Sequence, residues 1–341
     1  MKAIQRIVAM SLVLLMTAAA SGTPTRVTMN TGRDSNPHWD PTAGGNRIVY
    51  LRDISGAGMV NSNGTDEAGI IVSGVAQTDD AFAWVGSHFL YGDAAGLHQV
   101  YDYSVSAFPV ITEIFSFQSG VTHVGPVASR GQTVIWRVGW NSGTKTELHV
   151  DTYSNLVSSA SQRAQDAGTV VLTRSDTQIG VRGMSLLPDG RSAVMSLPNG
   201  SIGGWDIFLI DTDPTNGLAA PAEITTTGRT TGLLNWFPEV SPNGSQILFG
   251  RKNGAIAAEK TDLFLMNING SGLVNLTNSP GVEENCPTWS PNGQDYAFQR
   301  FDTGLPGESD NWNIYVDQTP EPATMTLLAI GGLAILRKRR K

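Results

Sequence analysis

Cys286-Pro287-Thr288-Trp289-Ser290-Pro291-Asn292-Gly293 is the stretch that decides the fold, and the apolar run Tyr296-Ala297-Phe298 follows shortly after it. Proline and Asn-Gly between two apolar segments are typical of a tight turn that joins two strands. The stretch therefore predicts a strand, a turn and a second strand. Two further copies have the same order of residues: Asn36-Pro37-His38-Trp39-Asp40-Pro41 before Arg47-Ile48-Val49-Tyr50, and Phe237-Pro238-Glu239-Val240-Ser241-Pro242-Asn243-Gly244 before Gln246-Ile247-Leu248-Phe249.

Three less regular copies fill the rest of the chain. They begin near Ala81, Pro126 and Ser185, and each has two apolar segments at a similar separation. A third apolar segment, such as Asp262–Asn267, follows most copies, and an Asn-Gly turn leads from the fifth copy into a fourth segment. Six units of four antiparallel strands, spaced by about 40 to 60 residues, predict an all-β, six-bladed β-propeller.

The repeat is similar to that of TolB-like propellers, in which Pro-x-Trp-Ser-Pro-Asp/Asn-Gly precedes an apolar strand. Trp289 to Gly293 match this pattern in full, whereas Trp39-Asp40-Pro41 has Asp in place of Ser and a longer turn. The clear matches cover residues 24–60 and 180–317, and the blade boundaries between 74 and 178 rest on spacing. The resemblance implies a broad, rigid face for partners, because TolB-like proteins commonly serve protein interactions.

The N-terminal segment of the body is expected to close the ring. The sixth unit ends at Asp317 with three strands, so that one strand is missing. Val27 lies 12 residues before Trp39, and Leu276 of the preceding unit lies 13 residues before Trp289. Residues 26–29 are therefore expected to pair as the outer strand of the sixth blade and to cover its edge. The other interpretation is an unpaired N-terminus.

Both ends of the chain carry targeting segments that do not belong to the fold. Residues 1–21 have cations at Lys2 and Arg6, an apolar stretch and then three alanines, which is the layout of a secretory signal peptide. Residues 320–341 have Pro-Glu-Pro, an apolar run of 14 residues and five terminal cations. A stable spanning helix needs about 20 apolar residues, so this run is a marginal anchor.

The C-terminal layout resembles the PEP-CTERM sorting signal, which directs exported bacterial proteins to the membrane protease-transpeptidase exosortase. It implies signal peptidase and exosortase as partners, a transient tether through a short transmembrane helix, and a final place at the cell surface or outside the cell. An ordinary tail anchor is the other interpretation. The mature body comprises residues 22–319. The residues that carry the resemblance are Pro320, Glu321, Pro322, Arg337, Lys338, Arg339 and Arg340.

The body is more acidic than the full chain, which has 23 basic and 30 acidic residues and a net charge of −7. The signal peptide removes two cations, and the tail removes five cations and Glu321. The remaining 16 basic and 29 acidic residues give a net charge of −13. Such a surface repels nucleic acid and anionic lipid. The single cysteine, Cys286, excludes an intramolecular disulfide and is expected to be a small buried hydrophobe.

Motifs of the common enzyme classes do not occur in the sequence. It has no nucleophile elbow, no His-Glu-x-x-His motif, no phosphate-binding loop and no dinucleotide fingerprint. The five histidines are scattered, and His38 is expected on a structural strand. Trp39, Trp84 and Trp289 are expected to pack between blades. We therefore predict no catalytic residue.

Candidate ligand-binding residues come from the segments that enter the innermost strands, four or five positions before the position of Trp39. In a propeller these segments border the mouth of the central channel. Carboxylates there suit a divalent cation such as calcium, and an aromatic face suits a sugar ring. The other interpretation is a solvated polar rim, and no cofactor is required by the sequence. The set is Asp34, Asp79, Asp80, His123, Arg182, Trp236, Glu284 and Asn285.

Two functions remain open from the sequence. The first is a non-enzymatic binding or scaffold module in an extracellular polysaccharide matrix or against surface proteins. The second is a polysaccharide lyase or hydrolase with its site at the channel mouth. Propeller lyases generally use a metal with several histidines, and His123 alone falls at a mouth position, which disfavours the second function. A translocation role like that of TolB is not expected, because TolB has an additional N-terminal domain.

Overall fold

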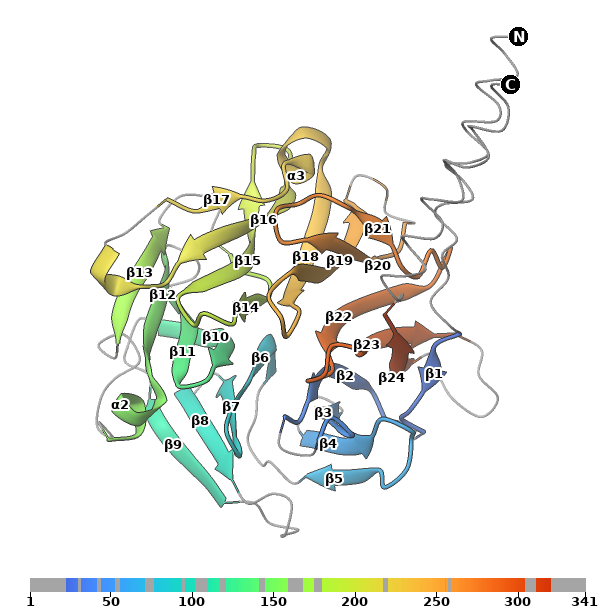
Figure 1. Ribbon diagram of the computed structural model, residues 1–341, viewed down its shortest axis with the longest axis horizontal. Helices are drawn as coiled ribbons and strands as arrows, with labels where there is room; N and C mark the ends of the chain where they lie inside the picture. Colours follow the sequence, from blue (N-terminus) through green and yellow to red (C-terminus); the bar gives the residue numbers. More distant parts are fainter. Residues whose placement is uncertain are drawn as a thin grey trace, which may run out of the picture.

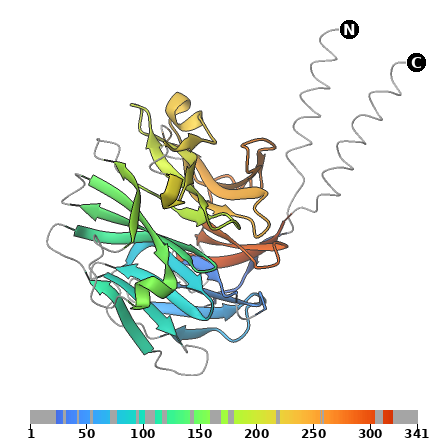
Figure 2. The same ribbon diagram turned by 60° about the vertical axis from the view of Figure 1, so that its left-hand side comes forward.

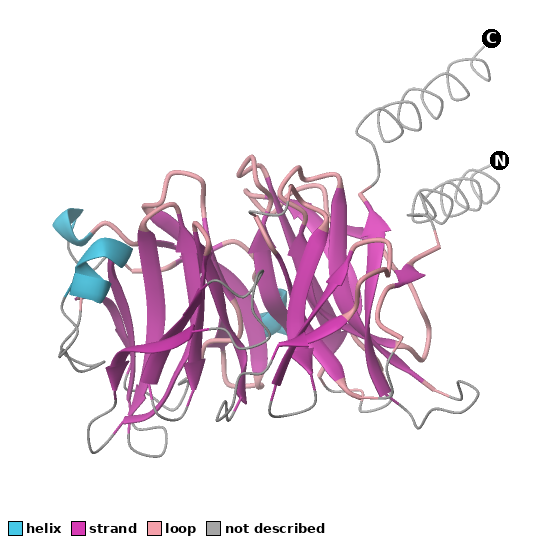
Figure 3. Ribbon diagram, turned by 90° about the horizontal axis from the view of Figure 1, so that it is seen from below, coloured by secondary structure: helices cyan, strands magenta, loops and turns pink. Residues whose placement is uncertain are grey.

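The computed structural model describes residues 23–29, 32–41, 44–52, 56–70, 77–93, 96–101, 110–116, 121–140, 145–158, 168–174, 180–216, 220–254, 256, 259–303 and 311–319. The signal peptide and the sorting segment 320–341 lie outside these residues. Strands make up most of the described chain, as Figure 3 shows. The helical elements are short: α2 (Tyr153–Ser158), α3 (Thr227–Thr231) and the 3-10 helix η2 (Pro214–Asn216). None of the helices in these ranges has the length and apolar character needed to cross a membrane.

Three four-stranded antiparallel sheets form the first half of the chain, each in sequence order. The first contains β2 (Asp34–Trp39), β3 (Arg47–Arg52), β4 (Gly56–Asn61) and β5 (Ala68–Ile70). The second contains β6 (Gln77–Val85), β7 (His88–Asp93), β8 (Gly96–Tyr101) and β9 (Val110–Ser116). The third contains β10 (Val121–Arg130), β11 (Thr133–Trp140), β12 (Lys145–Thr152) and β13 (Thr169–Arg174). The copies of the repeat that begin near Ala81 and Pro126 therefore do form strands in the expected order.

An eight-stranded sheet follows, and one parallel residue pair, Trp205 with Leu234, joins its two halves. One half contains β14 (Met184–Leu186), β15 (Ser192–Asn199), β16 (Gly204–Asp211) and β17 (Ala222–Glu223). The other half contains β18 (Leu233–Val240), β19 (Gln246–Asn253), β20 (Asp262–Asn267) and β21 (Val274–Asn275). Apart from that bridge, both halves pair antiparallel.

The last sheet joins the two ends of the body. Its order is β1 (Thr25–Arg26), β24 (Asn311–Gln318), β23 (Asp295–Asp302) and β22 (Glu283–Trp289). The prediction that the N-terminal segment pairs with the last strand is confirmed, with Thr25 opposite Val316. The pairing continues beyond β1, since the backbone nitrogen of Val27 donates to the oxygen of Ile314 at 2.9 Å. Figure 1 shows β1 in blue beside β24 in red.

The turn motif explains why the repeats fold alike. In two copies the motif serine, Ser241 or Ser290, accepts a hydrogen bond from the backbone nitrogen that opens the next strand, at 3.0 and 2.9 Å. Where the motif has Asp40 instead, the buried carboxylate accepts from Nε and Nη2 of Arg47 at 2.9 and 2.6 Å. The longer turn places a cation where the other copies place a backbone donor. The aspartate is thereby neutralised without breaking the repeat.

The apolar core lies between neighbouring sheets rather than inside any one of them. One cluster joins Trp39, Ile48 and Tyr50 of the first sheet to Ala297 and Ile314 of the last. Comparable clusters join the second sheet to the third and the third to the eight-stranded sheet. Because each sheet buries both faces against its neighbours, the sheets fan out around a common centre, as Figures 1 and 2 show. The fold is therefore all-β, mostly antiparallel and propeller-like.

Candidate binding cavity

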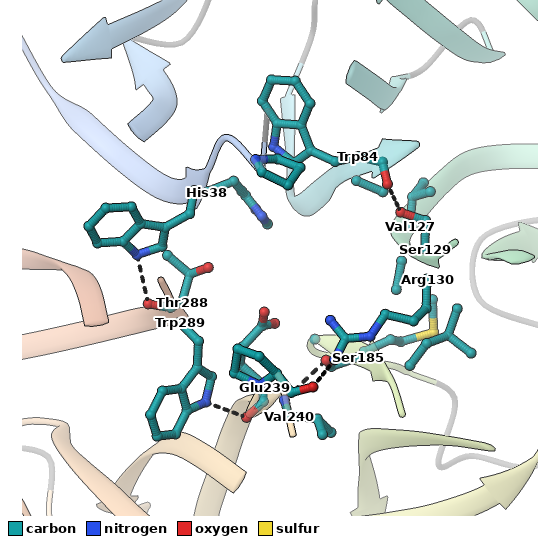
Figure 4. Close-up of a pocket in the computed structure, with 18 of the residues that line it drawn as sticks. His38, Trp84, Val127, Ser129, Arg130, Ser185, Glu239, Val240, Thr288 and Trp289 are labelled. Atoms are coloured by element: carbon teal, nitrogen blue, oxygen red, sulfur yellow. Dashed lines mark hydrogen bonds between the residues drawn. The ribbon is translucent and has the colours of Figure 1, made fainter. Parts of the chain in front are cut away.

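Strands β2, β6, β10, β14, β18 and β22 line a central cavity of about 470 Å³. Each strand contributes the residue directly before Trp39, or before the position that corresponds to Trp39 in the other repeats. Figure 4 shows most of these side chains around the opening. They are His38, Ala83, Val127, Ser185, Glu239 and Thr288.

A repeated backbone irregularity gives the lining its shape. Asn36, Phe237 and Cys286, each directly before a proline, have φ angles of 47°, 54° and 47°. Gly183 occupies the same position in β14's segment, with φ 76°. The strand pairing shifts register at these places in β2, β18 and β22, as a β-bulge does. The bulge turns the following residues toward the cavity.

Hydrogen bonds between neighbouring sheets, and between the two halves of the eight-stranded sheet, hold the lining strands together. Trp39 Nε1 donates to the Thr288 oxygen at 3.2 Å, and Trp289 Nε1 donates to the Glu239 oxygen at 3.1 Å. The Val240 nitrogen donates to Ser185 Oγ at 3.0 Å. Trp39 and Trp289 are each 5% exposed, so the prediction that they pack between units is confirmed. The cavity wall is therefore a bonded framework.

The main polar groups of the cavity are Arg130, Ser185 and Glu239, which come from three different strands. Arg130 reaches across toward β14 and β18, and its Nη2 donates to the Pro242 oxygen at 3.0 Å (Figure 4). Burial raises the pKa of Glu239 to about 7, and the charge of Arg130 and a hydrogen bond with Ser185 act in the opposite direction. The cavity thus combines a fixed cation with an acid whose pKa is raised toward neutrality.

The remaining polar lining is uncharged at neutral pH. Burial lowers the pKa of His38 to about 4, which leaves its imidazole neutral. Asn36 is 2% exposed, and within the described part of the chain its Nδ2 has no hydrogen-bond partner. Cys286 is buried, as predicted, and it contributes to the cavity lining. His38 lies on strand β2 as expected, but it also contributes to the cavity.

Of the eight residues that the sequence singled out, the five whose side chains the structure describes are not among those that line the cavity: Asp34, Arg182, Trp236, Glu284 and Asn285. Asp34 and Glu284 are fully buried and face arginines on the next strand, Arg52 at 3.4 Å and Arg300 at 3.7 Å. Burial raises the pKa of Glu284 to about 7. Asn285 is 9% exposed, and its Oδ1 accepts from the Cys286 nitrogen at 3.2 Å. These side chains stabilise the inner strands locally.

The pairs follow a pattern of the repeat. Asp34–Arg52, Asn235–Arg251 and Glu284–Arg300 are directly opposed residues of the first and second strands in their sheets. In the middle pair Arg251 Nε donates to Asn235 Oδ1 at 2.6 Å. In the last pair the two carboxylate oxygens of Glu284 have no hydrogen-bond partner among the described residues, so Arg300 at 3.7 Å stabilises that carboxylate by charge alone.

Arg182 and Trp236 are brought together by the fold. The guanidinium carbon of Arg182 lies 4.6 Å from the ring centroid of Trp236 and 5.8 Å from that of Trp205. Lys252 Nζ lies 5.8 Å from the Trp236 centroid. Such contacts are cation–π interactions, so the ring of Trp236 is partly engaged by the protein itself.

For Asp79, Asp80 and His123 the structure describes the position of the backbone. The first two lie on β6 and the third on β10, each ahead of the lining residues of its strand. Their side chains lie outside the described set. Within the described residues, no group of three or more His, Cys, Asp and Glu side chains has an arrangement that could hold a metal ion. Calcium binding therefore stays a prediction.

Arg130, Ser185, Glu239 and Asn36 are the cavity residues that the sequence reasoning missed. The sequence contains a signal for them, because successive side chains along a strand point to opposite faces of the sheet. Because the motif tryptophan packs between sheets, the residue before it must face the opposite side. The bulge one step earlier disturbs that alternation, so positions four and five residues before the tryptophan do not continue the lining.

The fold and the cavity define a propeller-like all-β protein with a polar central site. Residues 318–341 of the chain match the PEP-CTERM protein-sorting motif. This motif confirms the resemblance of the tail and implies export and processing by exosortase. The range includes the Pro-Glu-Pro element and the terminal cations. No sequence among curated proteins matches the chain.

Solved structures with the same fold confirm the propeller resemblance. A putative TolB from Agrobacterium tumefaciens is similar with a TM-score of 0.51 and 13% identity, covering 86% of this chain and 100% of that one. A luciferin-regenerating enzyme has a TM-score of 0.55 and 11% identity, over 87% and 95% of the two chains. An oligogalacturonate lyase in complex with manganese has a TM-score of 0.54 and 10% identity, over 89% and 95%. At these identities the likeness concerns the fold.

Proposed function

We propose that this chain is an exported surface protein whose body, residues 22–319, is a six-bladed propeller that acts as a non-enzymatic binding or scaffold module. Residues 1–21 direct export, and residues 320–341 tether the body to the membrane until exosortase acts. The partners are extracellular polysaccharide or other surface proteins. The observation that carries the proposal is the place of the sorting motif. It begins at Gln318, the last residue of β24, so the tail follows directly on the last strand of the body.

Several features support six blades and a closed ring. The eight-stranded sheet divides at a single parallel bridge into two units of four strands. The last sheet has three strands from its own unit, and β1 supplies the fourth. Closure through β1 joins both ends of the body by main-chain hydrogen bonds, which leaves no exposed sheet edge at that point.

The proposed role is tested by following the mature C-terminus. The full chain and a variant that ends at Thr319 are expressed in a host that has exosortase, and the exported proteins are analysed by mass spectrometry and cell fractionation. We expect the full chain to lose its terminal cations and to end near Pro320. We expect the shortened chain to pass into the medium without membrane association. Retention of Lys341 in the exported protein would contradict the proposal.

The second candidate function is a polysaccharide lyase or hydrolase with its site at the channel mouth. The observation in its favour is a half-buried acid with a pKa near neutrality, Glu239, which lines a central cavity together with Arg130. Incubation with acidic and neutral polysaccharides, followed by assays for unsaturated products and reducing ends, separates the two functions. Turnover that is lost in Glu239→Gln would favour the enzyme.

A further inference from the structure

We propose that the central cavity binds a small polyhydroxylated monocarboxylate, with Arg130 holding the carboxylate and Asn36, Ser185 and Glu239 contacting the hydroxyl groups. The inference deepens the proposed binding role and rests on it. Cavities of about 300–1,000 Å³ with a few convergent polar groups are typical of small-molecule sites. The 470 Å³ of this one therefore suits a small molecule.

Charge selects the class of ligand. Arg130 lines the cavity, and within the described residues no carboxylate lies in ion-pair range of its guanidinium. One of its five N–H groups is used by the Pro242 oxygen, so donors remain for a planar anion. His38 is neutral, and the partly protonated Glu239 balances less than one full charge. The positive charge of Arg130 would repel an organic cation, whereas it attracts a ligand with one carboxylate.

Neutral hydrogen-bonding groups select the rest of the ligand. The Nδ2 donor of Asn36 is buried without a partner in the described residues, and an unsatisfied buried donor is unfavourable. A ligand hydroxyl would satisfy it. Glu239 and Ser185 already bond to each other and can also accept or donate to a hydroxyl group. Donors and acceptors on several strands fit a molecule with several hydroxyl groups.

The walls between the polar groups are apolar. Val127, Met184, Leu186 and Val240 line the cavity, together with prolines of the bulges. Apolar walls exclude water and strengthen the interaction between Arg130 and an anion. A carbon chain that carries polar groups along its edges is complementary to a cavity in which polar groups are separated by apolar walls.

The pH dependence of binding follows from the same groups. Among the described residues, the titratable and charged groups that line the cavity together with Glu239 are Arg130 on β10, His38 on β2 and Cys286 on β22. A bound carboxylate repels an ionised Glu239 and so favours its protonated form. We expect affinity for the anion to fall as the pH rises from 6 to 8, the range that surrounds the pKa of about 7.

The experiment compares three molecules of equal length and different charge: gluconate, glucitol and glucamine. Each is titrated by calorimetry into the exported protein. We expect saturable binding of gluconate and at least about tenfold weaker binding of the other two, since a charge-assisted hydrogen bond contributes about 1.5–3 kcal/mol. Arg130→Gln is expected to lower the affinity for gluconate by at least about tenfold as well. Asn36→Ala is expected to weaken gluconate and glucitol to the same degree.

Arg182→Gln is the matched control, because Arg182 is exposed and lies outside the cavity lining. It should bind gluconate like the parent protein. The proposal is overturned if the three molecules bind alike, if Arg130→Gln binds like the parent, or if Arg182→Gln loses as much affinity as Arg130→Gln. Should Arg130→Gln fail to fold, Asn36→Ala and the three-ligand comparison decide the matter. Export and processing of the tail are measured separately, so failure here leaves the proposed surface location intact.

Discussion

At the scale of the residue, the most consequential feature is a backbone conformation that side chains seldom adopt. Phe237 has φ 54° directly before Pro238, and its Cα packs where a side chain on Gly183 would lie. A β-carbon added to Gly183 would be 2.5 Å from that Cα. Such conformations cost free energy and persist where the surroundings fix them. Here the surroundings are the neighbouring bulges, and the result is the shape of the cavity wall.

We predict that Gly183→Ala destabilises the protein severely. Its φ of 76° alone costs about 1–2 kcal/mol for a residue with a side chain, and the clash with backbone atoms adds to this cost. Gly203→Ala is the control, because Gly203 has φ 78° and no atom near the position of the added carbon. Urea unfolding should show a loss of about 1–2 kcal/mol for the control and clearly more for Gly183→Ala. Equal losses would refute the packing argument.

A second residue-scale prediction concerns Glu239, whose folded pKa of about 7 exceeds its ordinary value of 4.5. The folded protein then holds the proton more tightly than the unfolded chain. The free energy of unfolding should fall as the pH rises from about 4.5 to 7 and stay level above that range. Glu239→Gln should remove the part of this loss that Glu239 causes, which we put at about 2 kcal/mol because cavity water limits the cost, whereas the part caused by Glu284, with its pKa of about 7, should remain.

The measurement is urea unfolding of parent and variant at pH 4.5 and pH 8. Glu259→Gln serves as control, because Glu259 is exposed. The control should change with pH as the parent does. Identical pH dependence for Glu239→Gln and the parent would contradict a buried, partly protonated Glu239.

At the scale of the element, the short strand β1 matters more than its length indicates. Val27 and Thr28, directly after it, are fully buried, and Thr28 Oγ1 accepts from the Ile314 nitrogen at 3.0 Å. Arg26 Nη2 donates to Asn313 Oδ1 at 2.7 Å. These contacts attach the N-terminal segment to β24, and both ends of the body thereby depend on one another.

We predict that deletion of residues 24–30 costs at least about 4 kcal/mol, from the lost burial of Val27 and the lost hydrogen bonds to β24. Thermal unfolding should show a clear decrease of the melting temperature. Met29→Ala is the control, because the side chain of Met29 is 60% exposed. An unchanged melting temperature after the deletion would argue against a structural role of the segment.

At the scale of the whole molecule, the body and the sorting tail meet at a defined boundary. Gln318 ends β24, and the Thr319 nitrogen still donates to the Gln294 oxygen at 2.9 Å. The sorting motif begins at residue 318. A proteolytic cut beyond Thr319 therefore leaves the described sheet intact.

We predict that removal of residues 320–341 leaves the melting temperature unchanged, whereas a chain that ends at Ile314 unfolds at a clearly lower temperature. The longer truncation removes Tyr315 and Val316, the residues that face β1. Both variants are measured by circular dichroism during heating. A large loss of stability on removal of the tail alone would contradict a self-contained body.

The sequence by itself determined the C-terminal sorting segment, the all-β class and the pairing of the N-terminal segment with the last strand. These features depend on local composition, on turn chemistry and on a count of strands, and all of them can be read along the chain. The packing of Trp39 and Trp289 between sheets followed from the same repeat. The position of the cavity residues did not.

Only the tertiary structure decided which polar residues surround the centre. Counting back from Trp39 selected Asp34 and Glu284, yet both are buried against arginines of the next strand. The bulge at Asn36, Phe237 and Cys286 interrupts the alternation of side chains, so the lining begins one position later and runs toward the motif. Ser185 lies 55 residues after Arg130, and Glu239 lies 109 residues after it. They meet because sheets packed around a common centre bring distant inner strands together. The pattern of residues along one strand does not show which other strands will lie next to it.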